Sequence, residues 1–158
     1  MSRLSAYVLM LLLGGCGFHL QGAFTTPAAM ARTYIAPSDP HSLFYRELRA
    51  ALQSSGVDLV DNAAGATATF TISFDETDQR VLSVSARNVP TEYEVYYTVR
   101  YALEGGSGPL LDYQTLTLTR NYTYNPTLVL GKAREEALLR EAIVDDLVRI
   151  VLKQISTL

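Results

Sequence analysis

The chain has 158 residues, with one cysteine, no tryptophan and ten tyrosines, and a formal net charge of −3. This length fits one compact domain, and a single cysteine excludes both an internal disulfide and a multi-cysteine metal site. The acidic balance argues against nucleic acid as a partner, because nucleic-acid binding requires clustered lysines and arginines. An apolar fraction of 48% excludes a disordered chain.

Residues 1–15 are predicted to be an export signal. Arg3 supplies a positive end, and the uninterrupted apolar run 6–13 is too short to span a bilayer, which takes about 20 residues. The following Leu13-Gly14-Gly15-Cys16 resembles a bacterial lipobox, in which the cysteine receives an S-diacylglycerol group and, after cleavage, an N-acyl chain. The alternative is an ordinary secretory signal with a stray cysteine. We favour lipidation because the only cysteine of the chain stands where this chemistry requires it.

Lipidation at Cys16 predicts a membrane-anchored protein. One acyl chain binds a membrane only marginally and reversibly, whereas three would hold the protein there almost permanently. The residue after the cysteine is Gly17 rather than aspartate. By resemblance to bacterial sorting rules, this indicates the outer membrane, with the domain facing the periplasm.

Residues 16–31 are expected to form a lipidated lead-in, and residues 32–158 a single α+β domain. The expected elements are a strand over 32–36, a helix over about 40–55, a brief strand or extended connector over 57–61, one long bent strand over 66–86, strands over 91–104 and 111–123, and a second helix from between 125 and 132 nearly to the end.

Local signals support these boundaries. Asp39 is the expected N-cap of the first helix, with Pro40 at its first position, and Gly56 is its expected stop. In the long strand, the even-numbered apolar residues of 66–74 are predicted to face one side, and the same phase resumes at Leu82. The next strand alternates in the same way and carries Tyr93, Tyr97 and Tyr101 on its predicted core face.

These elements predict a mixed four-stranded sheet with two helices packed on one face, in the order β-α-β-β-β-α. The first strand, helix and second strand form a crossover, which is right-handed and pairs its two strands in parallel. The remaining strands follow as antiparallel hairpins. The second sheet face is predicted to be rich in Thr, Ser, Tyr and charge, and either solvated or turned toward a large wet partner.

No enzyme, metal site or cofactor is predicted. His19 lies near the anchor and His41 near the start of the first helix, which makes a poor zinc site. Gly105-Gly106-Ser107-Gly108-Pro109 reads as a turn rather than a nucleophile elbow. The acidic run Asp75-Glu76-Thr77-Asp78 is predicted to be a solvated strand bend. A calcium site is the alternative, but the ligand spacing and glycine of a calcium loop are missing.

Several segments along the chain together resemble the LptE family, the lipopolysaccharide-assembly lipoproteins of Gram-negative outer membranes. They are Cys16-Gly17-Phe18-His19-Leu20, Ser38-Asp39-Pro40, Ser55-Gly56-Val57-Asp58-Leu59-Val60, Arg87-Asn88 before Glu92-Tyr93, and Arg120-Asn121-Tyr122-Thr123-Tyr124-Asn125-Pro126 leading into Leu130-x-Lys132-x-x-Glu135. The chain departs from the family at Gln21, where a basic residue is common, and in lacking the polar C-terminal tail of some members.

The resemblance implies a protein that is not an enzyme. Such proteins plug a large β-barrel, the LptD-type translocon, help it to assemble, and with it place lipopolysaccharide in the outer leaflet. The domain would then face both the periplasm and the barrel lumen. The alternative is a periplasm-facing lipoprotein cofactor of another envelope machine, as a peptidoglycan synthase activator or a barrel-assembly accessory. The short lead-in argues against that alternative, because an activator must reach far from its membrane.

The resemblance also implies candidate contact residues. Arg87 and Lys132 match positions where the family places basic residues, and both are expected at the same end of the sheet, with Arg120 slightly upstream. These cations are candidates for the phosphates of lipopolysaccharide, although they would also suit solvated strand and helix ends. Candidate contacts with the barrel are three tyrosines that we expect to be less committed to the core, Tyr96, Tyr122 and Tyr124.

Overall fold

The computed structural model describes residues 24–124 and 129–158. Its elements, in chain order, are a 3-10 turn η2 (Ala28–Met30), β1 (Arg32–Ala36), α2 (Leu43–Ser54), β2 (Asp58–Val60), a 3-10 turn η3 (Ala63–Gly65), β3 (Ala68–Val84), β4 (Pro90–Gly105), β5 (Gly108–Thr123) and α3 (Val129–Ile155). Within these ranges, no helix is both long and apolar enough to cross a bilayer.

The strands form one mixed sheet in the order β2-β1-β3-β4-β5. β1 runs parallel to both β2 and β3, whereas β3, β4 and β5 form a long antiparallel meander. The α+β prediction is confirmed, but the sheet has five strands rather than four. The extra strand is β2, in the segment for which the sequence allowed either a strand or a connector. It joins the sheet because β1 has a free edge after β3 takes the other one.

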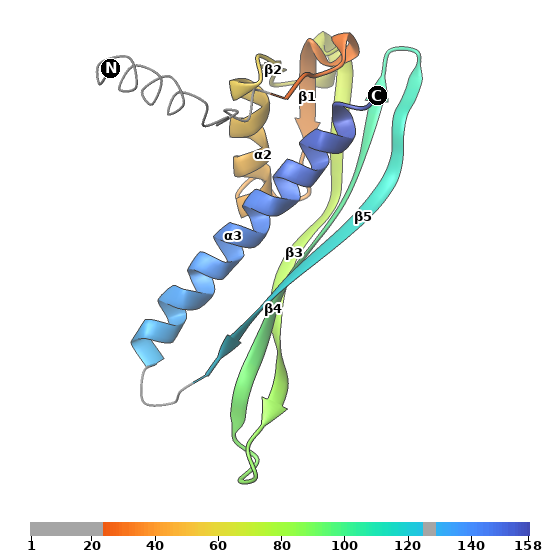
Figure 1. The fold of residues 1–158 in the computed structure, drawn as a ribbon. Coiled ribbons are helices and arrows are strands. Elements are labelled where there is room, and N and C mark those ends of the chain that lie inside the picture. The colour runs from red at the N-terminus through yellow and green to blue at the C-terminus, as the bar shows by residue number, and fades with distance from the viewer. Residues whose placement is uncertain (1–23, 125–128) are drawn as a thin grey trace, which may run out of the picture.

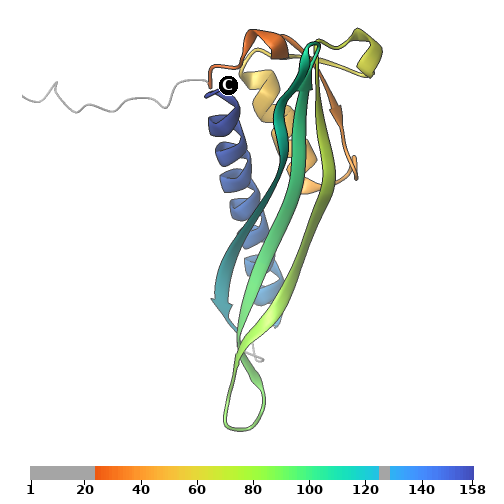
Figure 2. The ribbon, with the colours of Figure 1, turned by 90° about the vertical axis from the view of Figure 1, so that its right-hand side faces the viewer.

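Both helices lie on the same face of this sheet and leave the other face uncovered (Figures 1 and 2). The molecule is elongated. Turn η2, the C-terminus and the β4–β5 turn gather at one end, and the β3–β4 turn projects at the opposite end (Figure 1). We call residues 81–90, which form the end of that projecting hairpin, the hairpin tip.

Helix α2 begins later than predicted. Ser42, not Asp39, is its N-cap, and the Ser42 hydroxyl accepts a hydrogen bond from the backbone N–H of Tyr45 at 3.0 Å. Asp39 instead accepts a hydrogen bond from the N–H of His41 at 2.8 Å, in the turn before the helix. Either residue can cap a helix, so local sequence did not separate them. The predicted stop at Gly56 is confirmed: its φ is 85°, in the left-handed region that closes many helices.

Strand β3 is continuous, as predicted, but its facing pattern changes along its length. Phe70 and Ile72 are buried against the helices. The pairing with β4 then shifts between Ile72 and Phe74, so one extra residue is accommodated there as a β-bulge. From Asp75 to Val81 the odd-numbered residues face the helix side, and Phe74 is 39% exposed. The prediction of an unbroken even phase is therefore wrong.

The core lies between the sheet and the two helices. The predicted core row on β4 is confirmed, since Tyr97 and Tyr101 are buried and Tyr93 is partly buried against the same cluster. The Tyr101 ring stacks on that of Phe70 with centroids 5.4 Å apart. The C-terminal half of α3 contributes a stripe of buried aliphatic side chains, namely Ile143, Val144, Leu147, Val148, Val151, Leu152 and Ile155.

Candidate functional site

The uncovered sheet face, which we call the outer face, is polar. Cross-strand register puts one row from each long strand on it. The rows are Phe74, Glu76, Asp78 and Arg80 on β3, Glu92, Glu94, Tyr96, Thr98 and Arg100 on β4, and Thr115, Thr117, Thr119, Asn121 and Thr123 on β5. Every residue of the β5 row is exposed, and none of them is charged. The face is therefore a broad hydrogen-bonding surface rather than an apolar docking patch.

The hairpin tip carries Arg87 on an ordered turn. The Ser85 hydroxyl accepts hydrogen bonds from the N–H groups of Arg87 and Val89, each at 3.3 Å. The backbone N–H of Asn88 donates to the Ser85 carbonyl at 2.9 Å. Asn88 has a φ of 58°, a left-handed conformation that asparagine tolerates better than most residues. The turn thus presents an exposed Arg87 at the far end of the molecule.

The chain passes from the end of β5 into helix α3. β5 ends at Thr123, opposite Glu92 on β4, and the N–H of Tyr124 donates to the Thr91 carbonyl at 2.8 Å. Helix α3 then starts beside the lower half of the sheet (Figure 1). Lys132 belongs to the first turn of α3, and its side chain lies outside the described part of the structure. The common end expected for Arg87 and Lys132 stays a prediction, because the hairpin tip extends past the start of α3 (Figures 1 and 2).

Arg120 differs from the other two candidate cations because it has a carboxylate partner. Its guanidinium forms an ion pair with Asp146 of α3, and its Nη1 donates to the Thr119 carbonyl at 3.2 Å. Asp146 also accepts from Arg149 at 2.8 Å. The side chain of Arg120 thus faces the helix side of the sheet and links β5 to α3. The sequence did not indicate this pairing, since Arg120 and Asp146 belong to different elements.

The three candidate tyrosines have different environments. Tyr96 lies on the outer face, with its hydroxyl donating to Asp78 at 3.4 Å and Arg80 placed 5.7 Å from its ring. Tyr124 packs edge-on against Tyr93 at 5.3 Å and is partly buried.

Tyr122 lies deeper than expected. It is 7% exposed, it stacks on Tyr93 with ring centroids 5.7 Å apart, and its hydroxyl donates to Gln79 at 3.0 Å. Burial raises the pKa of the Tyr122 hydroxyl, with nearby acidic and tyrosine side chains adding to the rise. The expectation that Tyr122 is weakly committed to the core is wrong, because the strand register turns it toward the helices.

The acidic run on β3 is divided between the two sheet faces. Glu76 and Asp78 lie on the outer face, whereas Asp75 points toward α2. In the described ranges, no group of three or more His, Cys, Asp or Glu side chains is arranged to hold a metal ion. The strand alternation itself separates these carboxylates.

Asp75 instead joins the sheet to the start of α2. Its carboxylate accepts hydrogen bonds from the hydroxyls of Ser42 and Tyr97, the latter at 2.7 Å. The Phe44 N–H donates to the same Tyr97 hydroxyl at 3.4 Å. Burial raises the pKa of the Asp75 carboxyl and Asp39 adds to the rise, whereas the two hydroxyl hydrogen bonds oppose it. Burial and the neighbouring Asp75 also raise the pKa of the Tyr97 hydroxyl.

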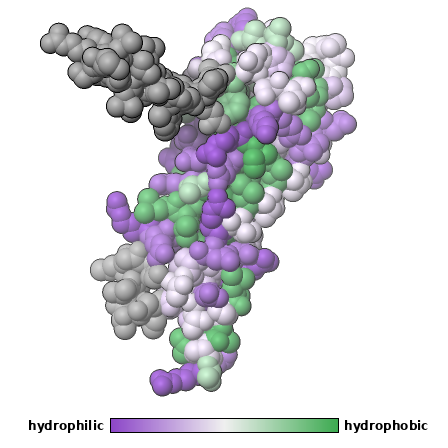
Figure 3. All heavy atoms as spheres, viewed as in Figure 1, coloured by the Kyte–Doolittle hydropathy of each residue, from purple (hydrophilic) through white to green (hydrophobic). Residues whose placement is uncertain are grey.

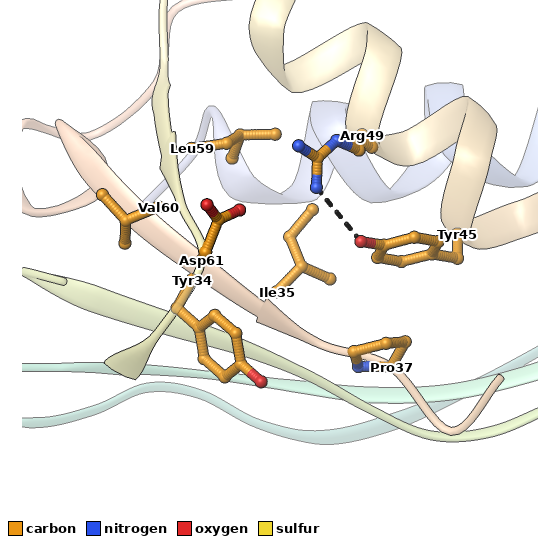
Figure 4. Close-up of a pocket in the computed structure, with 8 residues that line it drawn as sticks. All are labelled: Tyr34, Ile35, Pro37, Tyr45, Arg49, Leu59, Val60 and Asp61. Atoms are coloured by element: carbon orange, nitrogen blue, oxygen red, sulfur yellow. Dashed lines mark hydrogen bonds between the residues drawn. The ribbon is translucent and has the colours of Figure 1, made fainter. Parts of the chain in front are cut away.

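A separate hollow of about 200 Å³ opens between α2 and the ends of β1 and β2 (Figure 4). Its lining residues are Tyr34, Ile35, Pro37, Tyr45, Arg49, Leu59, Val60 and Asp61. On the α2 side of the hollow, Arg49 donates to the Tyr45 hydroxyl at 3.2 Å. Pockets that enclose a ligand usually measure roughly 300–1,000 Å³, so this hollow is too small for a lipid. The sequence did not predict this hollow, because its lining comes from three separate segments of the chain.

Comparison with known proteins identifies the family to which this chain belongs. The family model for LptE, described as lipopolysaccharide-assembly, matches residues 30–155, so the chain belongs to the LptE family. The family acts in lipopolysaccharide assembly and is not enzymatic.

Curated relatives and solved structures agree with this membership. The LPS-assembly lipoprotein LptE of Pectobacterium atrosepticum is 27% identical over 154 residues, covering 94% of this chain and 81% of the relative. That of Photorhabdus laumondii is 23% identical, covering 95% and 86%. The NMR structure of lipoprotein B from Nitrosomonas europaea has a TM-score of 0.73 at 26% identity, covering 89% of this chain and 90% of its own. The crystal structure of rare lipoprotein B from Shewanella oneidensis shares the fold, with a TM-score of 0.70 at 22% identity, covering 80% and 94%.

Proposed function

We propose that this protein plugs a large outer-membrane β-barrel of the LptD type, helps it to assemble, and binds lipopolysaccharide on its way to the outer leaflet. The observation that carries the proposal is the polar outer face on a chain of the lipopolysaccharide-assembly family. Barrel lumens are lined by polar side chains, and exposed threonines on β5 suit hydrogen bonding to such a wall without burying a charge.

The proposed anchor is Cys16, which lies outside the described residues. Lipidation there, with Gly17 following, would tether the domain to the outer membrane on its periplasmic side. The domain begins near the end of the molecule that is opposite the hairpin tip (Figure 1). With the anchor at that end, the long axis of the domain would lead away from the membrane attachment. A plug that extends into a barrel lumen needs such a shape.

For lipopolysaccharide we propose contacts by Arg87, on the hairpin tip, and Lys132, in the first turn of α3. Arg87 is exposed, and among the described residues no carboxylate forms an ion pair with it. Charge-assisted bonds from such cations to phosphate are stronger than neutral ones. Arg120 is a weaker candidate, because a phosphate would have to compete with Asp146. Tyr96 and Tyr124 remain our candidates for the barrel contact.

The barrel is tested by a pull-down from outer membranes in mild detergent, using a C-terminally tagged full chain. We expect one large β-barrel to co-elute in near-equal amount. Thr117→Trp, which adds bulk on the outer face, should reduce that amount. Leu138→Trp, at a 54% exposed position of α3, is the control for bulk away from the sheet. A different envelope complex, or no stoichiometric partner, would refute the plug proposal.

Direct lipopolysaccharide binding is tested by reversing the two cations. Arg87→Glu with Lys132→Glu should weaken binding at low salt by at least about tenfold, since each reversal removes a charge-assisted contact. The matched control reverses Arg46 of α2 and Lys153 in the last turn of α3, which changes net charge equally elsewhere. Unchanged affinity in the first variant, or equal loss in the control, would contradict a localised site.

A further inference from the structure

The hairpin tip is unusually apolar for a solvent-exposed element. Four aliphatic side chains there are strongly exposed, namely Val81 at 46%, Leu82 at 43%, Val84 at 52% and Val89 at 43%. They make up four of the nine large hydrophobic side chains that are exposed in the described ranges. Scattered exposed apolar residues are ordinary, but a contiguous group marks an interaction surface.

The tip has no layer of its own fold to cover it. Helices α2 and α3 lie along one face of the sheet, and the β3–β4 hairpin extends past both of them (Figures 1 and 2). β5 stops opposite Glu92, so the residues beyond it form a two-stranded ribbon. Apolar side chains are visible along this lower end in Figure 3, next to hydrophilic ones.

The ribbon is held in a defined shape. The second β3–β4 pairing shift falls between Val81 and Ser83, and the Ser83 hydroxyl shares a hydrogen bond of 2.7 Å with the Thr91 hydroxyl. At the turn, the N–H of Ser85 donates to the Val89 carbonyl at 2.8 Å. The exposed aliphatic side chains therefore project from a fixed backbone, so binding by the tip costs little ordering entropy.

The composition of the tip selects the kind of partner. Tight protein interfaces concentrate aromatic and arginine anchors that fill pockets, whereas residues 81–90 contain no aromatic residue and only one cation, Arg87. A convex aliphatic wedge needs no matching pocket if its partner is fluid hydrocarbon. A cation beside that wedge suits a molecule whose acyl chains adjoin phosphate groups.

We propose that the hairpin tip binds the acylated, phosphate-bearing end of lipopolysaccharide, with the four aliphatic side chains contacting acyl chains and Arg87 a neighbouring phosphate. This inference rests on the proposed lipopolysaccharide binding and extends it from charge to hydrocarbon. The tip thereby shields part of the acyl surface from water, which charge contacts alone do not accomplish.

The test compares lipopolysaccharide with the same material after alkaline removal of acyl chains, using phosphatidylglycerol as a third probe. Full-length protein is kept at one fixed detergent concentration throughout. Leu82→Ser with Val84→Ser should lose about tenfold or more in affinity for intact lipopolysaccharide, because two partly exposed aliphatic side chains no longer bury apolar area. It should bind the deacylated form as the unaltered protein does.

Two further variants control for the fold. Leu82→Met with Val84→Ile keeps the apolar surface and should retain affinity. Leu138→Ser with Ile150→Ser removes exposed aliphatic area from α3 instead and should have no effect. Far-UV circular dichroism and thermal unfolding check that every variant is folded.

Distinct outcomes overturn the inference or its basis. If the double-serine variant binds intact lipopolysaccharide normally while Arg87→Glu weakens both forms, recognition is by charge alone, and only the acyl inference fails. An equal loss for phosphatidylglycerol would mean a general lipid-inserting wedge and would refute the commitment to lipopolysaccharide. If the unaltered protein binds neither form, direct binding itself fails, and the inference fails with it.

Discussion

Replacing Tyr97 with phenylalanine removes one hydroxyl from the junction between α2 and the sheet. The aromatic ring stays buried, so the packing is conserved, but Asp75 loses the hydrogen bond that it accepts at 2.7 Å. The Phe44 N–H loses an acceptor as well. A hydrogen bond to a charged group contributes about 1.5–3 kcal/mol, and a neutral one about 0.5–1.5 kcal/mol.

Because Asp75 is only half-buried, the lower end of the charged range applies, and we expect a loss of about 1.5 kcal/mol in the free energy of unfolding at pH 7. The Tyr97 hydrogen bond lowers the pKa of Asp75, so its removal raises that pKa further. At pH 3.5 a larger share of Asp75 is protonated and the lost bond becomes closer to neutral. The destabilisation should then fall to about 0.5–1 kcal/mol.

Urea unfolding followed by far-UV circular dichroism at the two pH values measures this difference. Tyr101→Phe is the matched control, since Tyr101 is equally buried and its hydroxyl donates to the neutral Gln154 at 2.6 Å. Its cost should be the same at both pH values, because no carboxylate is involved. A pH-independent loss for Tyr97→Phe, or the same pH profile in both variants, would refute the role given to the Asp75 carboxylate.

Four further predictions follow from single contacts. Burial raises the pKa of Asp75 in the folded state. The contribution of Asp75 to stability is therefore present below its unfolded pKa and is lost as pH rises through its folded pKa. Asp75→Asn should accordingly gain stability relative to the parent between pH 3 and pH 7 in the same unfolding assay. Asn88→Val should cost about 1–2 kcal/mol in urea unfolding, because a β-branched residue resists a φ of 58°; Asn88→Gly should be near neutral, and equal effects would contradict this. Phe70→Ala should cost about 3–5 kcal/mol by the same measurement, since it removes a fully buried ring stacked on Tyr101. Asp146→Asn should cost under about 1 kcal/mol and less in high salt, because its ion pair with Arg120 is partly exposed; a large, salt-independent loss would mean that the pair is structurally dominant.

Much of the fold was readable from local pattern. The apolar alternation of β4 predicted its buried tyrosine row, and Gly56 predicted the end of α2. These signals are local: strand alternation needs only neighbouring residues, and a left-handed helix stop needs only one glycine. The family resemblance likewise depended on short segments spread along the chain, and the match over residues 30–155 confirms it.

Tertiary structure decided what depends on partners distant in sequence. The bulge after Ile72 is set by pairing with β4. Because of this bulge, Asp75 faces the helix side of the sheet and the apolar Phe74 faces the other side. Tyr122 became buried because register places it opposite Tyr93. Arg120 pairs with the carboxylate of Asp146, which lies 26 positions further along the chain on α3. A run of residues defines its own periodicity, but not which face its neighbours will cover, because register and helix packing arise only when separate elements meet.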